Sequence, residues 1–248
     1  MASTVINTNA VIQVLTLPDD CLKFQVPFAM SISGPSQSGK TSFMCSLIEN
    51  RDQLFTASFE RIILCQHENL SFRHNETFER LRNTFPMIEL VSGLPNISKL
   101  KLDINPSVAT MVLIDDLQTE FLESQDMLHL LSVSVHHFNI SVCYTLQNFF
   151  APSRFGKSLS RNVNYKIFFY NRLDLTELRH ISLQITPNNS TFLQSCFNFL
   201  ISHFPNDRHY ILVDGHFRSS TPQLFVRSNI FPKKETNEIE PIIFFSSV

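Results

Sequence analysis

The sequence has no tryptophan, only five glycines in 248 residues and no long apolar run. A membrane-spanning helix needs about 18–20 apolar residues, so we expect no membrane partner. The amino terminus lacks the basic start and apolar stretch of a signal peptide, which predicts a soluble, intracellular protein. Only 17% of the residues are charged and 43% are hydrophobic, which excludes a disordered chain and predicts a sizeable core.

Cysteine and histidine are too scattered to form a metal site or a disulfide framework. No two of the five cysteines lie close together in the sequence, and most lie within apolar runs, so we expect them to be reduced and mostly buried. No pair of histidines has the His-x-x-x-His spacing of a helical zinc site. The sequence therefore argues against zinc chemistry.

The net charge of −2 hides an uneven distribution. Residues 115–126 contain five acidic side chains and no basic one, whereas residues 151–172 contain five basic side chains and no acidic one. A net charge near zero excludes a uniformly basic protein but leaves room for a local basic surface.

Apolar strand-like segments alternate with helical patterns, which is typical of a parallel sheet covered by helices. The predicted strands are Val26–Ser33, Arg61–Gln66, Ile88–Val91, Thr110–Asp115, Asn139–Leu146, Val163–Tyr170, His209–Asp214 and Gln223–Arg227. The predicted helices are Lys40–Asn50, Glu76–Thr84, Leu117–His136, Leu175–Ile185 and Thr191–His203. The fold class is therefore α/β, with added strands towards the carboxyl terminus.

The predicted organisation is one main domain with two appendages. Residues 1–25 form an amino-terminal extension, residues 26–231 the main domain, and residues 232–248 a carboxyl-terminal tail. The tail is charged and bounded by prolines before a final apolar segment, Ile242–Phe245. That segment is predicted either to form a strand on a sheet of its own or to dock on a neighbour.

A complete phosphate-binding motif, G-x-x-x-x-G-K-[ST], follows the first predicted strand and opens the first predicted helix. Its residues are Gly34, Pro35, Ser36, Gln37, Ser38, Gly39, Lys40 and Thr41, and Ser42 follows them. The glycines allow backbone amides to surround phosphate oxygens at the positive end of the helix. Lys40 is expected to reach the β- and γ-phosphates, and the Thr41 hydroxyl to bind Mg²⁺.

Two adjacent carboxylates, Asp115 and Asp116, end an apolar strand. A P-loop needs an acid on a neighbouring strand, and open α/β sheets bind ligands at the carboxyl ends of their strands. Asp115 is expected to bind Mg²⁺ through water, and Asp116 to orient or polarise the attacking water. The alternative is that Asp116 only caps the helix that starts near Leu117.

The next predicted strand ends in Gln147, whose amide is expected to sense the γ-phosphate or the attacking water. Taken alone, Gln147 is as well explained as a surface amide. The basic stretch after it contains Arg154, Lys157 and Arg161. These side chains are expected to contact DNA phosphates or a nucleotide bound to a neighbouring subunit, with a solvated basic loop as the alternative.

The segment Pro27–Gly34 leading into the P-loop, the Ile114–Leu117 acid strand and Gln147 together resemble the FtsK–HerA superfamily. More narrowly, the chain is similar to the poxvirus-type genome-packaging ATPases of large DNA viruses, adintoviruses and Polinton (Maverick) elements. The similarity covers roughly residues 25–230. It implies a RecA-like (ASCE) P-loop ATPase core.

The resemblance also implies a function. It suggests a hexameric ring that uses ATP and Mg²⁺ to pump double-stranded DNA into a capsid, with a capsid or portal component as partner. The protein would then act in the host nucleus or at a viral assembly site, and could accompany the virion. Arg161 matches the arginine that lies near the subunit boundary in this family, with Arg154 and Lys157 as competitors. Many relatives carry Glu where this chain has Asp116.

Two other functions remain open. A replicative or recombination helicase would use the same fold. A GTP-dependent switch is suggested by the segment 171–174, Asn-Arg-Leu-Asp, which resembles the guanine-reading Asn-Lys-x-Asp motif of small GTPases. However, Arg172 replaces the lysine, and the acid strand continues Asp115-Asp116-Leu117-Gln118, without the Asp-x-x-Gly that a GTPase switch needs.

Overall fold

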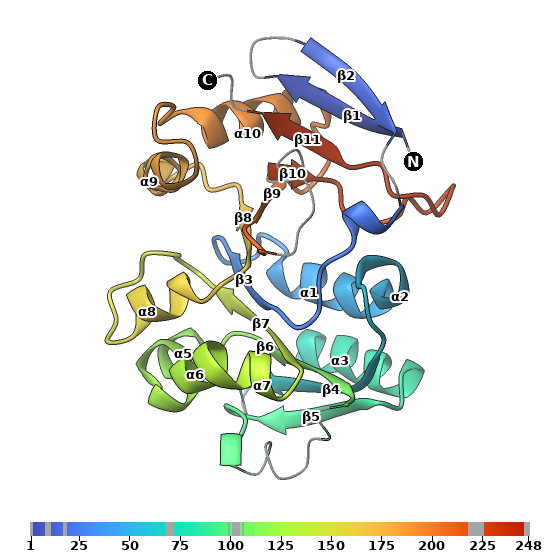
Figure 1. Ribbon diagram of the computed structural model, residues 1–248, viewed down its shortest axis with the longest axis vertical. Helices are drawn as coiled ribbons and strands as arrows, with labels where there is room; N and C mark the ends of the chain where they lie inside the picture. The colour runs from blue at the N-terminus through green and yellow to red at the C-terminus, as the bar shows by residue number, and fades with distance from the viewer. Residues whose placement is uncertain are drawn as a thin grey trace.

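The computed structural model describes residues 2–7, 11–16, 19–67, 72–98, 100, 105, 107–217 and 226–245. Within these residues an eleven-stranded sheet runs through the protein, with helices on both faces (Figure 1). No helix of the described residues is long and apolar enough to cross a membrane.

Six neighbouring strands of the sheet are parallel. In spatial order they are β8 (Tyr165–Phe169), β3 (Ala29–Ser33), β7 (Ile140–Leu146), β6 (Ala109–Ile114), β4 (Phe59–Gln66) and β5 (Ile88–Ser92). Every residue of β3, β6 and β7 is buried, because helices cover both faces of this part of the sheet. This is the α/β architecture that the sequence predicted, a mainly parallel sheet flanked by helices.

The order of these strands corrects one expectation. The P-loop strand β3 and the acid-bearing strand β6 are not direct neighbours, because β7 pairs with both of them. The strand that ends in Gln147 therefore lies between the phosphate-binding loop and the acids. This position brings polar groups from three strand ends together at one edge.

The other part of the sheet is mixed and includes both ends of the chain. Its strands are β9 (Tyr210–Asp214), β10 (Val226–Ser228), β11 (Ile242–Phe245), β1 (Ala2–Asn7) and β2 (Val11–Thr16). The predicted strand Gln223–Arg227 corresponds to β10, and its first three residues lie outside the described part of the chain.

The final apolar segment forms β11, and its position differs from both predictions. β11 joins the main sheet, antiparallel to β10 and parallel to β1. Ile242, Ile243 and Phe244 are buried there, so the strand buries apolar side chains in the central core instead of forming a separate sheet.

Two helical layers cover the sheet, and each has its own hydrophobic core. One layer consists of α1 (Lys40–Glu49), α2 (Arg51–Leu54) and α3 (Phe72–Thr84). The other consists of α5 (Gln118–Glu123), α6 (Gln125–His129), the π-helical turn η2 (Leu130–Ser134), α7 (Val135–His137), α8 (Gly156–Arg161), α9 (Leu175–Ile185) and α10 (Phe192–His203). A short 3₁₀ turn, η1 (Asp19–Leu22), precedes β3.

The long predicted helix Leu117–His136 is wrong as a single element. The chain is extended at Ser124, with ψ 121°, and the Ser124 hydroxyl accepts a hydrogen bond from the Met127 amide at 3.3 Å. Serine competes for backbone amides in this way at helix starts, so α6 begins anew after α5. The prediction for the cysteines is confirmed for Cys45, Cys65, Cys143 and Cys196, which are buried and not disulfide-bonded.

Candidate functional site

The phosphate-binding loop connects β3 to α1, and its two glycines have distinct structural reasons. A Cβ added at Gly34 would lie 2.6 Å from the Cβ of Phe169 on β8, so only glycine fits between these two strands. Gly39 has φ 108°, a left-handed conformation that L side chains rarely adopt, and it is the N-cap residue of α1. The loop is thus fixed by close packing at one end and by backbone conformation at the other.

The amino terminus of α1 offers its amides to an anion. No side chain caps this helix and no acidic residue lies in its first turn. Ser36, Gln37 and the Ser42 side chain are exposed beside it, whereas Pro35 is half-buried. The Ser38 hydroxyl is buried without a hydrogen-bond partner, which leaves this loop with an unsatisfied polar group. These features fit a bound phosphate.

Lys40 lies over the loop that precedes it. Its Nζ donates hydrogen bonds to the carbonyl oxygens of Gly34 at 2.7 Å and Pro35 at 2.8 Å. Burial lowers the pKa of Lys40, and the nearby carboxylates of Asp115 and Asp116 partly offset this effect by raising it. The Lys40 ammonium is poorly solvated and lies beside the uncapped start of α1, so the site favours a ligand with several negative charges over a single carboxylate.

Asp115 is the centre of a hydrogen-bonded group. It is 2% exposed, and its two carboxylate oxygens accept hydrogen bonds from the hydroxyls of Thr41 at 2.7 Å and Thr145 at 2.9 Å. Thr41 and Asp115 are thus adjacent oxygen ligands of the kind that Mg²⁺ prefers. The described residues contain no group of three or more His, Cys, Asp or Glu side chains that could hold a metal. A magnesium ion here would therefore need further oxygens from phosphate and water.

Thr145 was missed by the sequence analysis. It lies on β7, and besides donating to Asp115 it accepts a hydrogen bond from the Asp116 amide at 2.9 Å. Its side chain therefore fixes both acids. The only sequence signal was a hydroxyl residue near the end of an otherwise apolar strand, and that signal does not reveal the partner.

Asp116 is exposed, in contrast to the buried Asp115, and its backbone has φ 54°. Such a conformation costs energy in a non-glycine residue and occurs often at functional sites. Helix α5 begins after Asp116 with Leu117 as its N-cap residue, and no side chain caps it. Asp116 therefore projects at the end of β6 without the capping contact that was the alternative interpretation.

Gln147 lies at the end of β7, and its side chain is exposed. Its backbone amide donates to the Oε1 atom of Gln118 at 2.5 Å. Gln118 is the first residue of α5, so this contact links the strand end to the helix that follows Asp116. The sequence analysis did not single out Gln118.

These groups line one cavity of about 420 Å³, which we call the phosphate cavity. Its lining residues are Ser36, Gln37, Gly39, Lys40, Thr41, Ser42, Asp115, Asp116, Thr145, Gln147 and Arg208. Of the catalytic residues predicted from the sequence, Lys40, Asp116 and Gln147 are in this cavity. Arg208 is an additional cation, and its Nη1 donates to the Ser42 hydroxyl at 3.4 Å.

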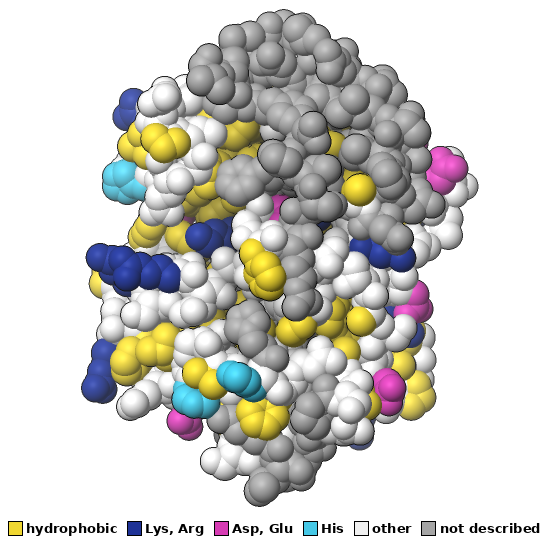
Figure 2. Space-filling model, in the orientation of Figure 1, with side chains coloured by type: hydrophobic (Ala, Val, Ile, Leu, Met, Phe, Trp, Pro, Cys, Tyr) yellow, Lys and Arg dark blue, Asp and Glu magenta, His cyan; other side chains and the backbone are white. Residues whose placement is uncertain are grey.

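Arg161 does not line the phosphate cavity of its own chain. It is exposed at the end of α8 and borders a second cavity of about 530 Å³, which we call the basic cavity. Lys157 and Lys166 also line the basic cavity, and its lining includes no acidic residue. Figure 2 shows Lys and Arg side chains at the left-hand edge of the molecule, near α8. Burial lowers the pKa of Lys166, whose ammonium group lies 5.5 Å from the centre of the Phe149 ring.

The segment that resembles a guanine-reading motif has local structural roles. Asp174 is the N-cap of α9, and its carboxylate accepts a hydrogen bond from the Glu177 amide at 3.0 Å. The Asn171 side chain accepts from the Leu173 amide at 3.0 Å, and Leu173 is 97% exposed. These contacts describe a turn followed by a helix cap.

Neither a known protein family nor a curated protein matches the sequence. Solved structures give matches of low identity. The genome packaging NTPase B204 from Sulfolobus turreted icosahedral virus 2, solved with ATP-gammaS, is 14% identical, and the match covers 76% of this chain and 92% of B204 with a TM-score of 0.43. The KaiC-like protein PH0186 from Pyrococcus horikoshii is 15% identical, with 58% and 71% covered and a TM-score of 0.40.

ATPases 2 and 3 of EssC from Geobacillus thermodenitrificans are 14% identical to this chain, and the match covers 57% of it with a TM-score of 0.41. The match spans about a third of the EssC chain, 32%.

Proposed function

We propose that this protein is a magnesium-dependent P-loop ATPase. The observation that carries the proposal is the phosphate cavity, in which Lys40, Thr41, Asp115, Asp116 and Gln147 converge from the ends of β6 and β7 and the start of α1. Nucleotide hydrolysis requires four parts, which are a phosphate-binding loop, a metal-binding pair, an exposed acid and a polar strand end.

Each group has a distinct task in this proposal. The first amides of α1 and the Lys40 ammonium bind the phosphates and offset their charge. Thr41 and Asp115 hold Mg²⁺, which when bound supplies additional positive charge at the β- and γ-phosphates. Asp116 orients the attacking water and accepts its proton, and Gln147 responds to the γ-phosphate. Thr145 positions both acids through the hydrogen bonds described above.

Two variants separate binding from hydrolysis. We expect Lys40→Ala to lose ATP binding, measured by titration calorimetry. We expect Asp116→Asn to bind ATP normally but to release phosphate at least about 100-fold more slowly. Asp126→Asn is the matched control, because Asp126 is an exposed acid on α6 that does not line the phosphate cavity. Wild-type ATPase activity in Asp116→Asn would remove that residue from the mechanism.

The finer part of the proposal is that ATP hydrolysis moves double-stranded DNA into a capsid. It rests on the resemblance of the P-loop, acid and Gln147 segments to packaging ATPases. The basic cavity adds support, because three cations without an acidic neighbour suit phosphate groups. Contacts of this kind read no base sequence, as a packaging motor requires. A hexameric ring and a capsid or portal partner belong to the same proposal.

Duplex DNA provides the test. We expect blunt duplex to stimulate ATP hydrolysis without strand separation, and the stimulation to fall steeply with salt because phosphate contacts release counterions. Lys157→Ala should reduce the stimulation, whereas Arg82→Ala, an exposed arginine on α3, should not. Unwinding of a forked substrate would instead favour the helicase alternative. A strong preference for GTP over ATP would contradict the packaging function.

The role of Arg161 can be tested by mixing subunits. If Arg161 acts on the nucleotide of a neighbouring subunit, Lys40→Ala and Arg161→Ala proteins should each be inactive but regain activity when mixed. The Lys40→Ala subunit still supplies Arg161, and the Arg161→Ala subunit still binds ATP. No recovery in mixtures whose mass confirms hetero-oligomers would exclude action in trans.

A further inference from the structure

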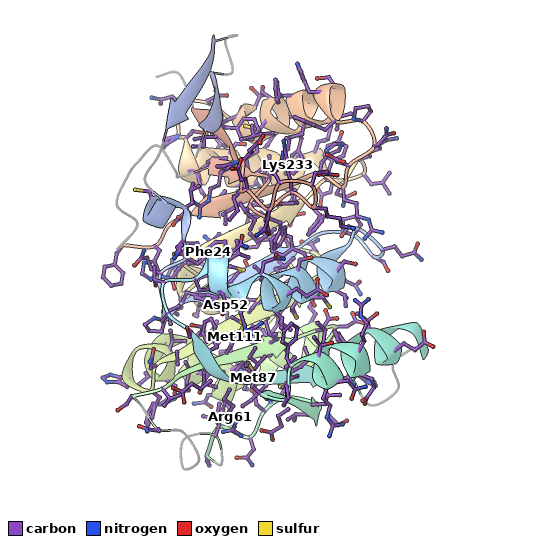
Figure 3. All side chains as sticks on the ribbon, turned by 90° about the vertical axis from the view of Figure 1, so that its right-hand side faces the viewer. Phe24, Asp52, Arg61, Met87, Met111 and Lys233 are labelled. Atoms are coloured by element: carbon purple, nitrogen blue, oxygen red, sulfur yellow. The ribbon has the colours of Figure 1, made fainter. Side chains whose placement is uncertain are left out.

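A third cavity adjoins the phosphate cavity and shares Arg208 with it. This tail cavity has a volume of about 380 Å³, within the range of small-molecule sites. It is lined by residues that follow α10 and by the segment that connects β10 to β11, including Asp207, Tyr210, Asn229, Phe231 and Glu240. Figure 3 shows Lys233, another lining residue, in the part of the tail above α1.

The phosphate cavity fixes the direction in which a nucleotide would extend. Lys40, Thr41 and Asp115 place the β- and γ-phosphates near Asp116. The rest of the nucleotide must leave the cavity on another side. On the α1 side the wall consists of Ser42 and the Arg208 guanidinium, which are in contact, and the tail cavity lies directly beyond Arg208.

Gly39 supports the same position for Arg208. A Cβ at Gly39 would lie 2.9 Å from Nη1 and 3.0 Å from Cδ of Arg208, so the arginine side chain crosses the loop where glycine leaves space. No ion pair of Arg208 occurs within the described part of the chain. Its charge therefore remains available to a phosphate at the boundary between the two cavities.

The tail cavity has an apolar wall that is packed directly on α1. The Phe43 ring of α1 makes edge contacts with both Tyr210 and Phe231, at 4.9 Å between ring centres in each case. The segment that carries Phe231 is held in place by the ion pair between Lys233 and Glu240 at 2.6 Å and by the hydrogen bond from Gln53 to Asn237 at 3.2 Å. The wall is therefore a fixed surface, suited to an aromatic ring.

The two cavities differ in the groups that line them: the tail cavity has aromatic side chains, whereas the phosphate cavity has the loop and the start of α1. The carboxylates of Asp207 and Glu240 border the tail cavity together with the cations Arg208 and Lys233, and Glu240 is paired with Lys233. Carboxylate and amide oxygens do accept hydrogen bonds from ribose hydroxyls and from the amino group of a base. An aromatic wall with hydrogen-bond acceptors beside it suits a nucleoside, whereas Lys40 and the uncapped start of α1 suit phosphates.

We propose that the tail cavity binds the ribose and base of the nucleotide, that Phe231 contacts the base, and that Arg208 binds the α-phosphate between the two cavities. This inference rests on the proposed ATPase function and deepens it. It gives the tail segment a role in nucleotide selection, and it adds Arg208 and Phe231 to the site.

Comparison of ATP with inorganic tripolyphosphate tests this inference, because tripolyphosphate has the phosphates without ribose or base. Dissociation constants of the protein for both ligands are measured with Mg²⁺ by titration calorimetry. We expect Phe231→Leu, which keeps an apolar side chain but loses the ring, to weaken ATP binding roughly tenfold and to leave tripolyphosphate binding unchanged. Arg208→Ala should weaken both ligands, and Arg208→Lys should weaken them less.

Two further variants complete the design. Asn229→Gly removes an amide at a position with φ 54°, where glycine causes no strain, and should also weaken ATP alone. Phe150→Leu changes an exposed ring of the basic cavity and should affect neither ligand.

Equal weakening of both ligands by Phe231→Leu, or an unchanged affinity for ATP, would overturn the inference. Wild-type protein that binds tripolyphosphate as tightly as ATP would also overturn it, while leaving the phosphate cavity intact. Wild-type protein that binds neither ligand would instead refute the proposed ATPase function.

Discussion

Thr145→Val tests the hydrogen-bonded group around Asp115 most directly. Valine keeps the branched shape that suits β7 but removes the hydroxyl. Two contacts are lost at once: the bond donated to Asp115 at 2.9 Å and the bond accepted from the Asp116 amide at 2.9 Å. Asp115 stays buried with one fewer donor, and the Asp116 amide loses its side-chain partner.

The magnitude follows from these two losses. A hydrogen bond to a charged group contributes about 1.5–3 kcal/mol, and an amide left without a partner adds to the cost. We therefore expect the free energy of unfolding to fall by about 2–4 kcal/mol. Loss of a partner that orients a metal-binding carboxylate typically costs about 10–100-fold in activity or metal affinity, and we expect ATP hydrolysis to fall by that factor.

Urea unfolding and phosphate release measure the two effects separately. Thr145→Ser should stay close to wild type in both, because it keeps the hydroxyl. Ser31→Ala on β3 is the matched control, since the Ser31 hydroxyl is buried without a hydrogen-bond partner and its removal should not lower stability. Wild-type stability and activity in Thr145→Val would refute the assigned role of Thr145.

Three other predictions concern single side chains. Because burial lowers the pKa of Lys40, the free protein loses this positive charge at a lower pH than an ordinary lysine would. ATP binding should therefore weaken as the pH rises, and at high pH it should be accompanied by proton uptake. Calorimetry in buffers of different ionisation enthalpy measures this uptake. Lys166→Met removes a half-buried cation but keeps an apolar side chain beside Phe149, so the free energy of unfolding measured in urea should not fall. The stimulation of ATP hydrolysis by DNA should decrease. Gly34→Ala should lower the melting temperature and destabilise the fold by about 1–3 kcal/mol, because the new Cβ would lie 2.6 Å from the Cβ of Phe169. An unchanged melting temperature would contradict the close packing of β3 and β8.

Much of the parallel sheet was predictable because its signals are local. Strands such as β6 and β7 are mostly apolar runs, and the sequence pattern predicts their approximate ends. The break at Ser124 was missed, because a serine that caps a new helix looks in sequence like a serine on an exposed helical face. Its role depends on whether its hydroxyl bonds to the Met127 amide.

The phosphate-binding loop and the acid pair were also identified by the sequence, since each is a contiguous segment whose chemistry depends on neighbours in the chain. Their contact was not. Thr41 and Asp115 are 74 positions apart, and Thr145 lies 30 positions beyond Asp115, so their hydrogen bonds depend on the strand order. That order places β7 between β3 and β6, which the hydrophobic pattern alone did not specify.

The sequence by itself determined that this chain has the motif of a phosphate-binding loop, an acid-tipped strand and a polar strand end within an α/β core. Local residue order is sufficient for these features, because backbone conformation and strand burial depend mainly on residues that are neighbours in the chain. Only the tertiary structure decided that Thr145 supports the acids, that Arg208 reaches the loop and that β11 joins the main sheet. A single hydroxyl, an exposed arginine and a short apolar strand each have many potential partners, and packing between distant segments selects one.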